Sequence, residues 1–130
     1  MDIPTDLKYT DNDEWIRVEG NEAACGITDF AQDQLSDIVF VELLVSDGDS
    51  FKKGDPIATV ESVKTAADVY APVSGKVTAV NEELMDTPEL INSDPHGAAW
   101  ILKFELADAS EVDALLDADA YKKSAEERAH

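Results

Sequence analysis

Hydrophobic and polar positions along the chain follow a short-period pattern, in which brief apolar or alternating runs are separated by turn residues. Such runs predict β-strands over residues 15–18, 23–27, 38–45, 56–63, 68–73 and 76–80. The run over 38–45 is almost continuously apolar, so we expect a core strand that is covered on both faces. Glycine and proline predict turns at residues 47–49 and 53–56. The pattern therefore indicates a mainly β protein, a small sandwich or barrel.

Two segments carry helix signals. Thr28 can cap a short helix that runs through Leu35. Ser110 can cap a longer C-terminal helix over about 110–123, and its apolar residues would lie near one face and pack on the sheet. These apolar residues are Val112, Leu115, Leu116 and Tyr121. Residues 122–130 carry no apolar stripe and are expected to fray. Because no long linker interrupts the pattern, residues 1–130 are predicted to form a single domain.

The strongly acidic composition excludes some classes of binding partner. The chain has 29 acidic and 10 basic residues, a formal net charge of −19, and this disfavours nucleic acid and anionic membranes. The acids are scattered along the chain and suggest a solvated acidic coat. Self-repulsion in such a coat weakens in concentrated salt, so we hypothesise a halophilic, salt-adapted host, with a merely acidic carrier as the alternative. No long apolar run or signal peptide is visible, which predicts a cytoplasmic protein.

Catalytic and metal-binding motifs are not apparent. The chain has no Gly-rich phosphate loop, no HExxH and no CxxC, and its two histidines, His96 and His130, cannot form a metal site by themselves. The lone Cys25 is interpreted as a small buried hydrophobic residue, because it lies among small and apolar neighbours. Trp15 and Trp100 are expected to be core anchors. We therefore expect no catalytic residue and no metal ligand.

Lys64 is the one residue for which the sequence suggests a specific chemical role. The segment Glu-Ser-Val-Lys over residues 61–64, an Asp four residues later, and Tyr-Ala-Pro-Val-Ser-Gly over 70–75 resemble the lipoylation site of the glycine cleavage system H proteins. Further segments resemble that family in the same order, over residues 26–32, 37–43, 81–84 and 88–95. The resemblance covers roughly residues 8 to 121. Residues 62–65 contain no Gly, Asn or Pro, so the turn expected at Lys64 comes from the resemblance and not from the pattern.

The resemblance implies a fold and a set of site residues. The fold would be the biotinyl/lipoyl carrier type, a hammerhead β-sandwich with short helices and a C-terminal helix. Lys64 would carry lipoate through an amide bond, and Glu61 would be recognised by the enzyme that attaches it. Glu14 and Asp68 would flank a docking cleft for a cationic aminomethyl group, and Asn12 could add a hydrogen bond.

The resemblance also implies partners for a non-enzymatic carrier. These are a pyridoxal-phosphate glycine decarboxylase, a tetrahydrofolate-dependent aminomethyltransferase, dihydrolipoyl dehydrogenase, and a lipoate or octanoate ligase or transferase. The carrier would pass the aminomethyl group from the first to the second and be reoxidised by the third. Two alternatives stay open: a donor that relays lipoyl groups to 2-oxoacid dehydrogenases, and an unmodified interaction protein. Biotin is disfavoured because Val63 and Thr65, not methionines, flank Lys64.

Several positions depart from the usual family pattern. Asp13 stands where His is common, Ser36 where Gly is usual, and Leu44 where Pro is common. Ala98 and Ala99 replace a glycine before Trp100. None of these lies in the lysine segment, but they predict altered local geometry beside Glu14 and near Ser46.

Overall fold

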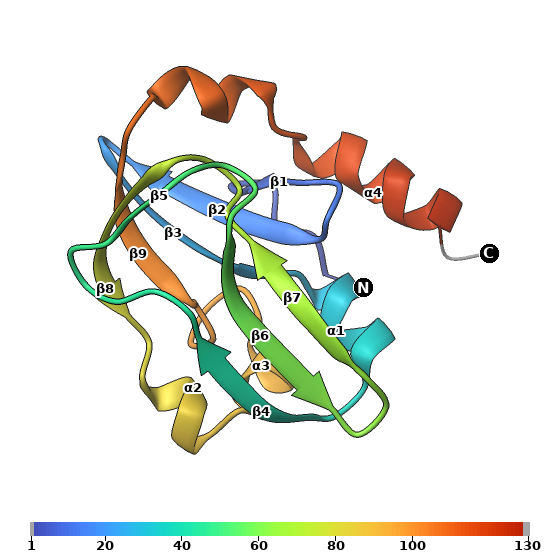
Figure 1. The fold of residues 1–130 in the computed structure, drawn as a ribbon. Coiled ribbons are helices and arrows are strands. Elements are labelled where there is room, and N and C mark those ends of the chain that lie inside the picture. Colours follow the sequence, from blue (N-terminus) through green and yellow to red (C-terminus); the bar gives the residue numbers. More distant parts are fainter. Residues whose placement is uncertain (1, 129–130) are drawn as a thin grey trace.

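The computed structural model describes residues 2–128, which form two antiparallel sheets and several short helices (Figure 1). The large sheet contains, in spatial order, β1 (Lys8–Tyr9), β2 (Glu14–Glu19), β3 (Glu22–Ile27), β9 (Leu102–Leu106), β8 (Gly75–Val80) and β5 (Ser50–Phe51). The small sheet contains β4 (Ile38–Leu43), β6 (Pro56–Ser62) and β7 (Ala66–Tyr70). The helices are α1 (Asp29–Leu35), α2 (Glu83–Asp86), α3 (Leu90–Ser93), the 3-10 helix η1 (Ala109–Ala114) and α4 (Ala118–Arg128).

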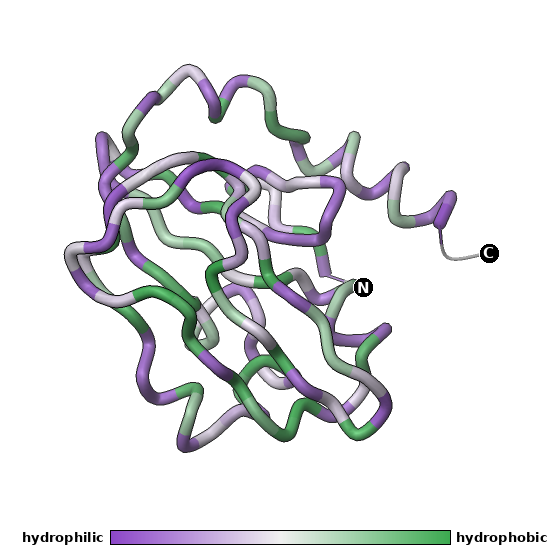
Figure 2. The backbone as a smooth tube through the Cα atoms, viewed as in Figure 1, coloured by the Kyte–Doolittle hydropathy of each residue, from purple (hydrophilic) through white to green (hydrophobic). Residues whose placement is uncertain are grey.

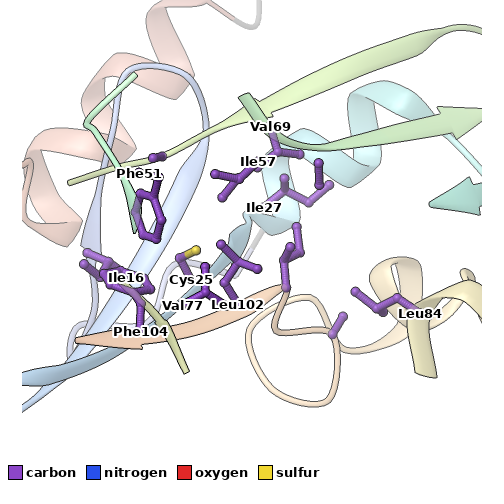
Figure 3. Packing of buried hydrophobic residues seen from close by; sticks show 14 of the residues in the cluster. Ile16, Cys25, Ile27, Phe51, Ile57, Val69, Val77, Leu84, Leu102 and Phe104 are labelled. Atoms are coloured by element: carbon purple, nitrogen blue, oxygen red, sulfur yellow. The ribbon is translucent and has the colours of Figure 1, made fainter. Parts of the chain in front are cut away.

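The main core lies between the two sheets. Ile57 and Val69 from the small sheet face Cys25 and Leu102 from the large sheet (Figure 3). Alternation explains why these side chains meet, because successive residues of a strand point to opposite faces. In β9, for example, residues 102, 104 and 106 are buried and the two between them are exposed. One continuous apolar cluster thus joins both sheets.

The mainly β architecture predicted from the sequence is confirmed, and all six expected strands are present. Three strands were missed. Two of them, β1 and β5, are only two residues long and leave almost no signal. The third, β9, has the alternating Leu-Lys-Phe-Glu-Leu sequence that is typical of a half-buried strand, so it could have been recognised.

The prediction that the 38–45 segment is a core strand covered on both faces is wrong. β4 is an edge strand of the small sheet, beside β6. Ile38 and Val41 are buried, whereas the side chains of Val39 and Phe40 are 53% and 47% exposed. Hydrophobicity alone could not reveal this, because an apolar residue on an exposed face leaves the same sequence signal as a buried one.

The predicted C-terminal helix over about 110–123 is also wrong in its bounds. Leu116 is extended and exchanges two backbone hydrogen bonds with Tyr9, both 2.8 Å, so a continuous helix cannot pass through it. Asp117 then caps α4 by accepting a hydrogen bond from the backbone N–H of Ala120 at 2.8 Å. Fraying from residue 122 is not observed up to Arg128, since α4 is helical throughout; residues 129–130 lie outside the described part.

A second apolar cluster holds α4 against the large sheet. Tyr121 of α4 stacks on Tyr9 of β1, with ring centroids 4.6 Å apart. Trp15 is fully buried in the same cluster, as expected of a core anchor, and its indole N–H donates to the carbonyl of Pro95 at 2.8 Å. Trp100 is partly buried and packs against this cluster. The cluster therefore fixes the C-terminal helix beside the start of β2.

Two local predictions are confirmed. Thr28 caps α1, since its hydroxyl accepts a hydrogen bond from the backbone N–H of Ala31 at 3.1 Å. Cys25 is buried, and burial raises the pKa of its thiol to about 12, which disfavours a reactive thiolate. Within residues 2–128, no helix combines the length and the hydrophobicity that a membrane span requires.

Candidate functional site

The hairpin between β6 and β7 places Lys64 at its tip, away from the large sheet (Figure 1). The turn contains no glycine or proline, and hydrogen bonds of the Ser62 side chain hold it closed. The Ser62 hydroxyl accepts hydrogen bonds from the backbone N–H groups of Lys64 at 3.1 Å and Thr65 at 3.0 Å, and donates to the carbonyl of Thr65 at 3.0 Å. The backbone N–H of Ser62 also donates to that carbonyl at 2.7 Å. One serine side chain thus closes the turn, as Ser and Thr do in ST-turns.

The tip is joined to the neighbouring edge strand. The backbone N–H of Val63 donates to the carbonyl of Asp37, just before β4, at 3.0 Å. Lys64 itself is exposed, and within residues 2–128 no carboxylate lies within ion-pair distance of its side chain. The amine is therefore available to a partner, while the backbone that carries it is held at both sides.

Glu61 and Asp68 lie on the outer face of the small sheet. Both are exposed, and Glu61 stands opposite Phe40 of β4. The carboxylate of Asp68 accepts a hydrogen bond from the hydroxyl of Thr59 on β6 at 3.0 Å. Glu61 lies on β6, the strand that leads to Lys64, and Asp68 lies on β7, the strand that follows it.

Glu14 lies at the opposite end of β7 and is only 2% exposed. Its carboxylate accepts a hydrogen bond from the hydroxyl of Thr10 at 2.6 Å and from the backbone N–H of Tyr70 at 3.4 Å. Burial raises the pKa of the Glu14 carboxyl to about 7, although these two hydrogen bonds oppose the shift. Glu14 can therefore gain or lose a proton near neutral pH.

Asp13, one of the residues that depart from the usual family pattern, anchors this end of the molecule. It adopts φ 67°, a left-handed conformation that Asp tolerates better than most residues. Its carboxylate accepts hydrogen bonds from Arg128 at 2.7 and 3.1 Å and from the hydroxyl of Tyr121 at 2.9 Å. The same hydroxyl lies 2.6 Å from that of Thr28. α4 is thus tied directly to the residue before Glu14.

The structure divides the predicted site residues into two groups. Glu14 and Asn12 line one open cavity of about 200 Å³, together with residues around Tyr9, Gly54 and Leu115. Lys64, Glu61 and Asp68 do not line it; they lie on the hairpin. Since β7 rises roughly 3.3 Å per residue, Ala66, at the Lys64 end of the strand, lies about 13 Å from Tyr70, at the Glu14 end, and Asp68 lies midway between them.

Three residues that shape the Lys64 turn or hold Glu14 were not identified from the sequence. Ser62 could have been recognised as an ST-turn residue. Thr10, four residues before Glu14, and Tyr70, 56 residues after it, both donate hydrogen bonds to the Glu14 carboxylate. The contact with Tyr70 could not be predicted from the residues near Glu14 in the sequence.

A β-sandwich that presents an exposed lysine at the tip of a braced hairpin defines a class of protein: the biotinyl and lipoyl carriers, which present a covalently bound cofactor to separate enzymes. The glycine cleavage H-protein family model matches residues 7–128. The chain belongs to this family.

Individual relatives agree with this assignment. The chain is 56% identical over 123 residues to the glycine cleavage system H protein of Listeria monocytogenes serotype 4a, covering 95% of this chain and 98% of that protein. It is 54% identical over 121 residues to that of Bacillus cereus strain AH820, with 93% and 94% covered. A crystal structure of a glycine cleavage system H protein from Mycobacterium marinum superimposes with a TM-score of 0.84 at 34% identity, covering 98% of this chain and all of that one.

The function predicted from the sequence is thereby confirmed. The protein is a lipoyl carrier of the glycine cleavage system and is not itself a catalyst. Its partners are the other enzymes of that system. The predicted β-sandwich with short helices and a C-terminal helix is confirmed as well.

Proposed function

We propose that Lys64 is the residue to which lipoate is attached through an amide bond. The observation that carries the proposal is the tip geometry: an exposed lysine with no ion pair in residues 2–128, on a turn closed by Ser62 and tied to β4 through Val63. When attached, the lipoyl group would supply a disulfide that can be reduced as it takes up the transferred group and reoxidised after that group has left. Lys64 holds the attachment point, and the braced hairpin fixes where the arm begins.

The opposite end of β7 receives the end of the arm. Glu14 and Asn12 line the cavity of about 200 Å³ there, and Asp68 lies on β7 between the cavity and Lys64. A cationic amine placed in the cavity favours the ionised form of Glu14, because an opposite charge lowers the pKa of a carboxyl. The buried carboxyl would then release a proton as the cation docks. Asn12 is exposed and can donate a hydrogen bond to the docked group.

The partners act at the hairpin in turn. They are a pyridoxal-phosphate glycine decarboxylase, a tetrahydrofolate-dependent aminomethyltransferase and dihydrolipoyl dehydrogenase, which link the carrier to one-carbon metabolism in the cytoplasm. A lipoate or octanoate ligase or transferase attaches the cofactor and contacts Glu61. Glu61 suits this role because it is exposed and stands three residues before Lys64.

Intact mass spectrometry of the protein from its own host tests the attachment, followed by peptide fragmentation. We expect a lipoyl-sized increment on Lys64. A Lys64→Arg variant expressed in the same cells serves as the control and should carry no increment. An unmodified Lys64, in cells that lipoylate other proteins, would contradict the proposal and favour the interaction-protein alternative.

A reconstituted assay separates the carrier from the lipoyl relay. With the three glycine cleavage enzymes present, the modified protein should support the release of CO₂ from glycine. Transfer of lipoyl groups to a 2-oxoacid dehydrogenase, with no glycine turnover, would favour the relay.

The domain organisation and the acidic coat belong to the same proposal. Residues 1–130 act as a single lipoyl-carrier domain, which is supported by the apolar cluster that joins both sheets.

The net charge of −19 reflects a high-salt cytoplasm, where dissolved ions screen the repulsion between the acidic side chains. The free energy of unfolding should then rise between dilute buffer and molar KCl. Equal stability in both would contradict salt adaptation.

A further inference from the structure

A β-bulge turns two neighbouring apolar side chains of β4 outward. The pairing of β4 with β6 shifts register between Ile38 and Phe40, so Val39 is the extra residue of the bulge. Strict alternation would place Phe40 on the same face as Ile38. Instead Ile38 and Val41 are 3% and 0% exposed, whereas Val39 and Phe40 are 53% and 47% exposed. Bulges are known to re-aim side chains next to functional sites.

The outward pair lies beside the Lys64 turn. Val63, which is 68% exposed, bonds through its backbone N–H to the carbonyl just before β4. Phe40 stands opposite Glu61, three residues before Lys64. Figure 2 shows the hydrophobic stretch of β4 beside the tip of the hairpin. We call the exposed side chains of Val39, Phe40 and Val63 the apolar edge patch.

The patch has an acidic border. The exposed carboxylates around it are those of Asp37, Glu42, Glu61 and Asp68. Across the described strands β4, β6 and β7 and their turn, Lys64 is the one basic residue. This border disfavours pairing with a second copy of the chain, because like charges would meet around the apolar centre. It favours a partner whose apolar contact is surrounded by Lys and Arg side chains.

Geometry selects one partner among those that use Lys64. An enzyme that acylates the lysine must bring its active site within the length of one lysine side chain of the hairpin, so its surface necessarily covers the neighbouring residues. Enzymes that act later reach the arm through the added length of the cofactor. We propose that the apolar edge patch is the docking surface for the acylating enzyme, which binds it with an apolar pocket bordered by basic side chains. The inference rests on the proposed modification of Lys64.

The step that this docking serves is an acyl transfer. The lysine nitrogen forms a C–N bond to the carbonyl carbon of an acyl adenylate, the bond from that carbon to the phosphate oxygen breaks, and AMP leaves with the electron pair. The amine gives up one proton. No change of oxidation state takes place, so only the acyl adenylate is needed as a co-reactant.

Initial rates of acylation test the docking surface. The unmodified full chain is incubated with a bacterial lipoate–protein ligase and lipoyl-AMP, and the product is followed by intact mass. We expect Phe40→Ser to lower kcat/KM at least tenfold, mainly through KM. Leu44→Ser is the matched control, because Leu44 is 44% exposed just beyond the other end of β4; its kcat/KM should stay within twofold of the original chain.

A chemical control separates docking from damage to the turn. N-hydroxysuccinimidyl acetate should acetylate Lys64 at the same rate in the Phe40→Ser variant and in the original chain. Where this rate changes, Val39→Asp replaces Phe40→Ser, since Val39 is the extra residue of the bulge and is more exposed. Raising the salt concentration should also lower kcat/KM of the original chain, as expected for charge-steered docking.

Three outcomes are informative. Variants that lose kcat/KM while Leu44→Ser keeps it support the docking surface. Patch variants that are acylated as fast as the original chain overturn it and leave Lys64 as the attachment site. Failure of the original chain to be acylated at Lys64 overturns the proposed function itself, and the docking surface with it.

Discussion

At the hairpin end of β7, Lys64 is exposed and its turn is held by a single serine side chain. At the other end, Glu14 is 2% exposed and accepts hydrogen bonds from two separate segments. Asp13, beside it, is bonded to two residues of α4. One strand thus connects an end built for access with an end built for burial.

This difference fits the roles proposed for the two ends. An attachment point at Lys64 would have to stay accessible to several enzymes, so few contacts would surround it and the backbone alone would be braced. In the proposed receiving site, burial of the carboxylate would strengthen its attraction for a cation, because charge interactions strengthen as the surroundings become less polar. The same burial raises the pKa of Glu14 to about 7.

The largest expected effect comes from removing Lys64, the proposed attachment point. Lys64→Arg keeps the charge but cannot form the lipoyl amide, so modification and carrier activity should be lost completely. The free energy of unfolding should change by less than about 0.5 kcal/mol, as for other exposed positions. Mass spectrometry and urea unfolding check both parts. A large loss of stability would show that the hairpin end is not built for access alone.

The pH dependence of stability probes the buried end. The pKa of Glu14 in the folded state, about 7, lies above its ordinary value of 4.5. The contribution of the Glu14 carboxyl to stability is therefore full below pH 4.5 and is lost as the pH rises through 7. The free energy of unfolding of Glu14→Gln should equal that of the original chain near pH 4 and exceed it by up to about 3 kcal/mol at pH 8.5.

Chemical unfolding at several pH values measures this difference. A Glu14→Gln difference that stays constant with pH would mean that the carboxyl is not desolvated.

Asp13→Ala tests the tie between α4 and the start of β2. The variant loses the contacts with Arg128 and Tyr121 and forces alanine into a left-handed conformation, so we expect a loss of about 1–2 kcal/mol. Asp13→Asn should lose less, because Asn tolerates that conformation. Thermal unfolding gives the values. Equal losses for the two variants would show that charge, and not backbone conformation, dominates at this position.

The smallest effect is expected at the turn. Ser62→Ala removes the side-chain hydrogen bonds that close the hairpin, but water can replace them at this partly exposed position, so the loss should be about 0.5–1 kcal/mol. The local free energy of opening, measured by amide exchange at Lys64 and Thr65, should fall by more than the global free energy of unfolding. Thr65→Val is the control, since the hydroxyl of Thr65 makes only a 3.5 Å contact with the carbonyl of Ala66.

Local patterns in the sequence determined much of this protein. Short apolar or alternating runs identified six strands, and Thr28 marked the start of α1, because side-chain direction and capping depend on residues a few positions apart. The co-linear segments around Lys64 predicted the family and the carrier role, and the comparisons confirm both. The assignment of Lys64 as the attachment point stays a prediction.

Only the tertiary structure decided which apolar segment is covered and which acid is buried. β4 has a core-like sequence, yet its place at the edge of the small sheet and its bulge expose Val39 and Phe40. The C-terminal helix breaks at Leu116 because the backbone there pairs with β1, more than 100 residues away. Glu14 is raised to a pKa of about 7 by burial among segments that are distant in the chain. Desolvation and strand pairing depend on such distant neighbours, and these are absent from any local window of the sequence.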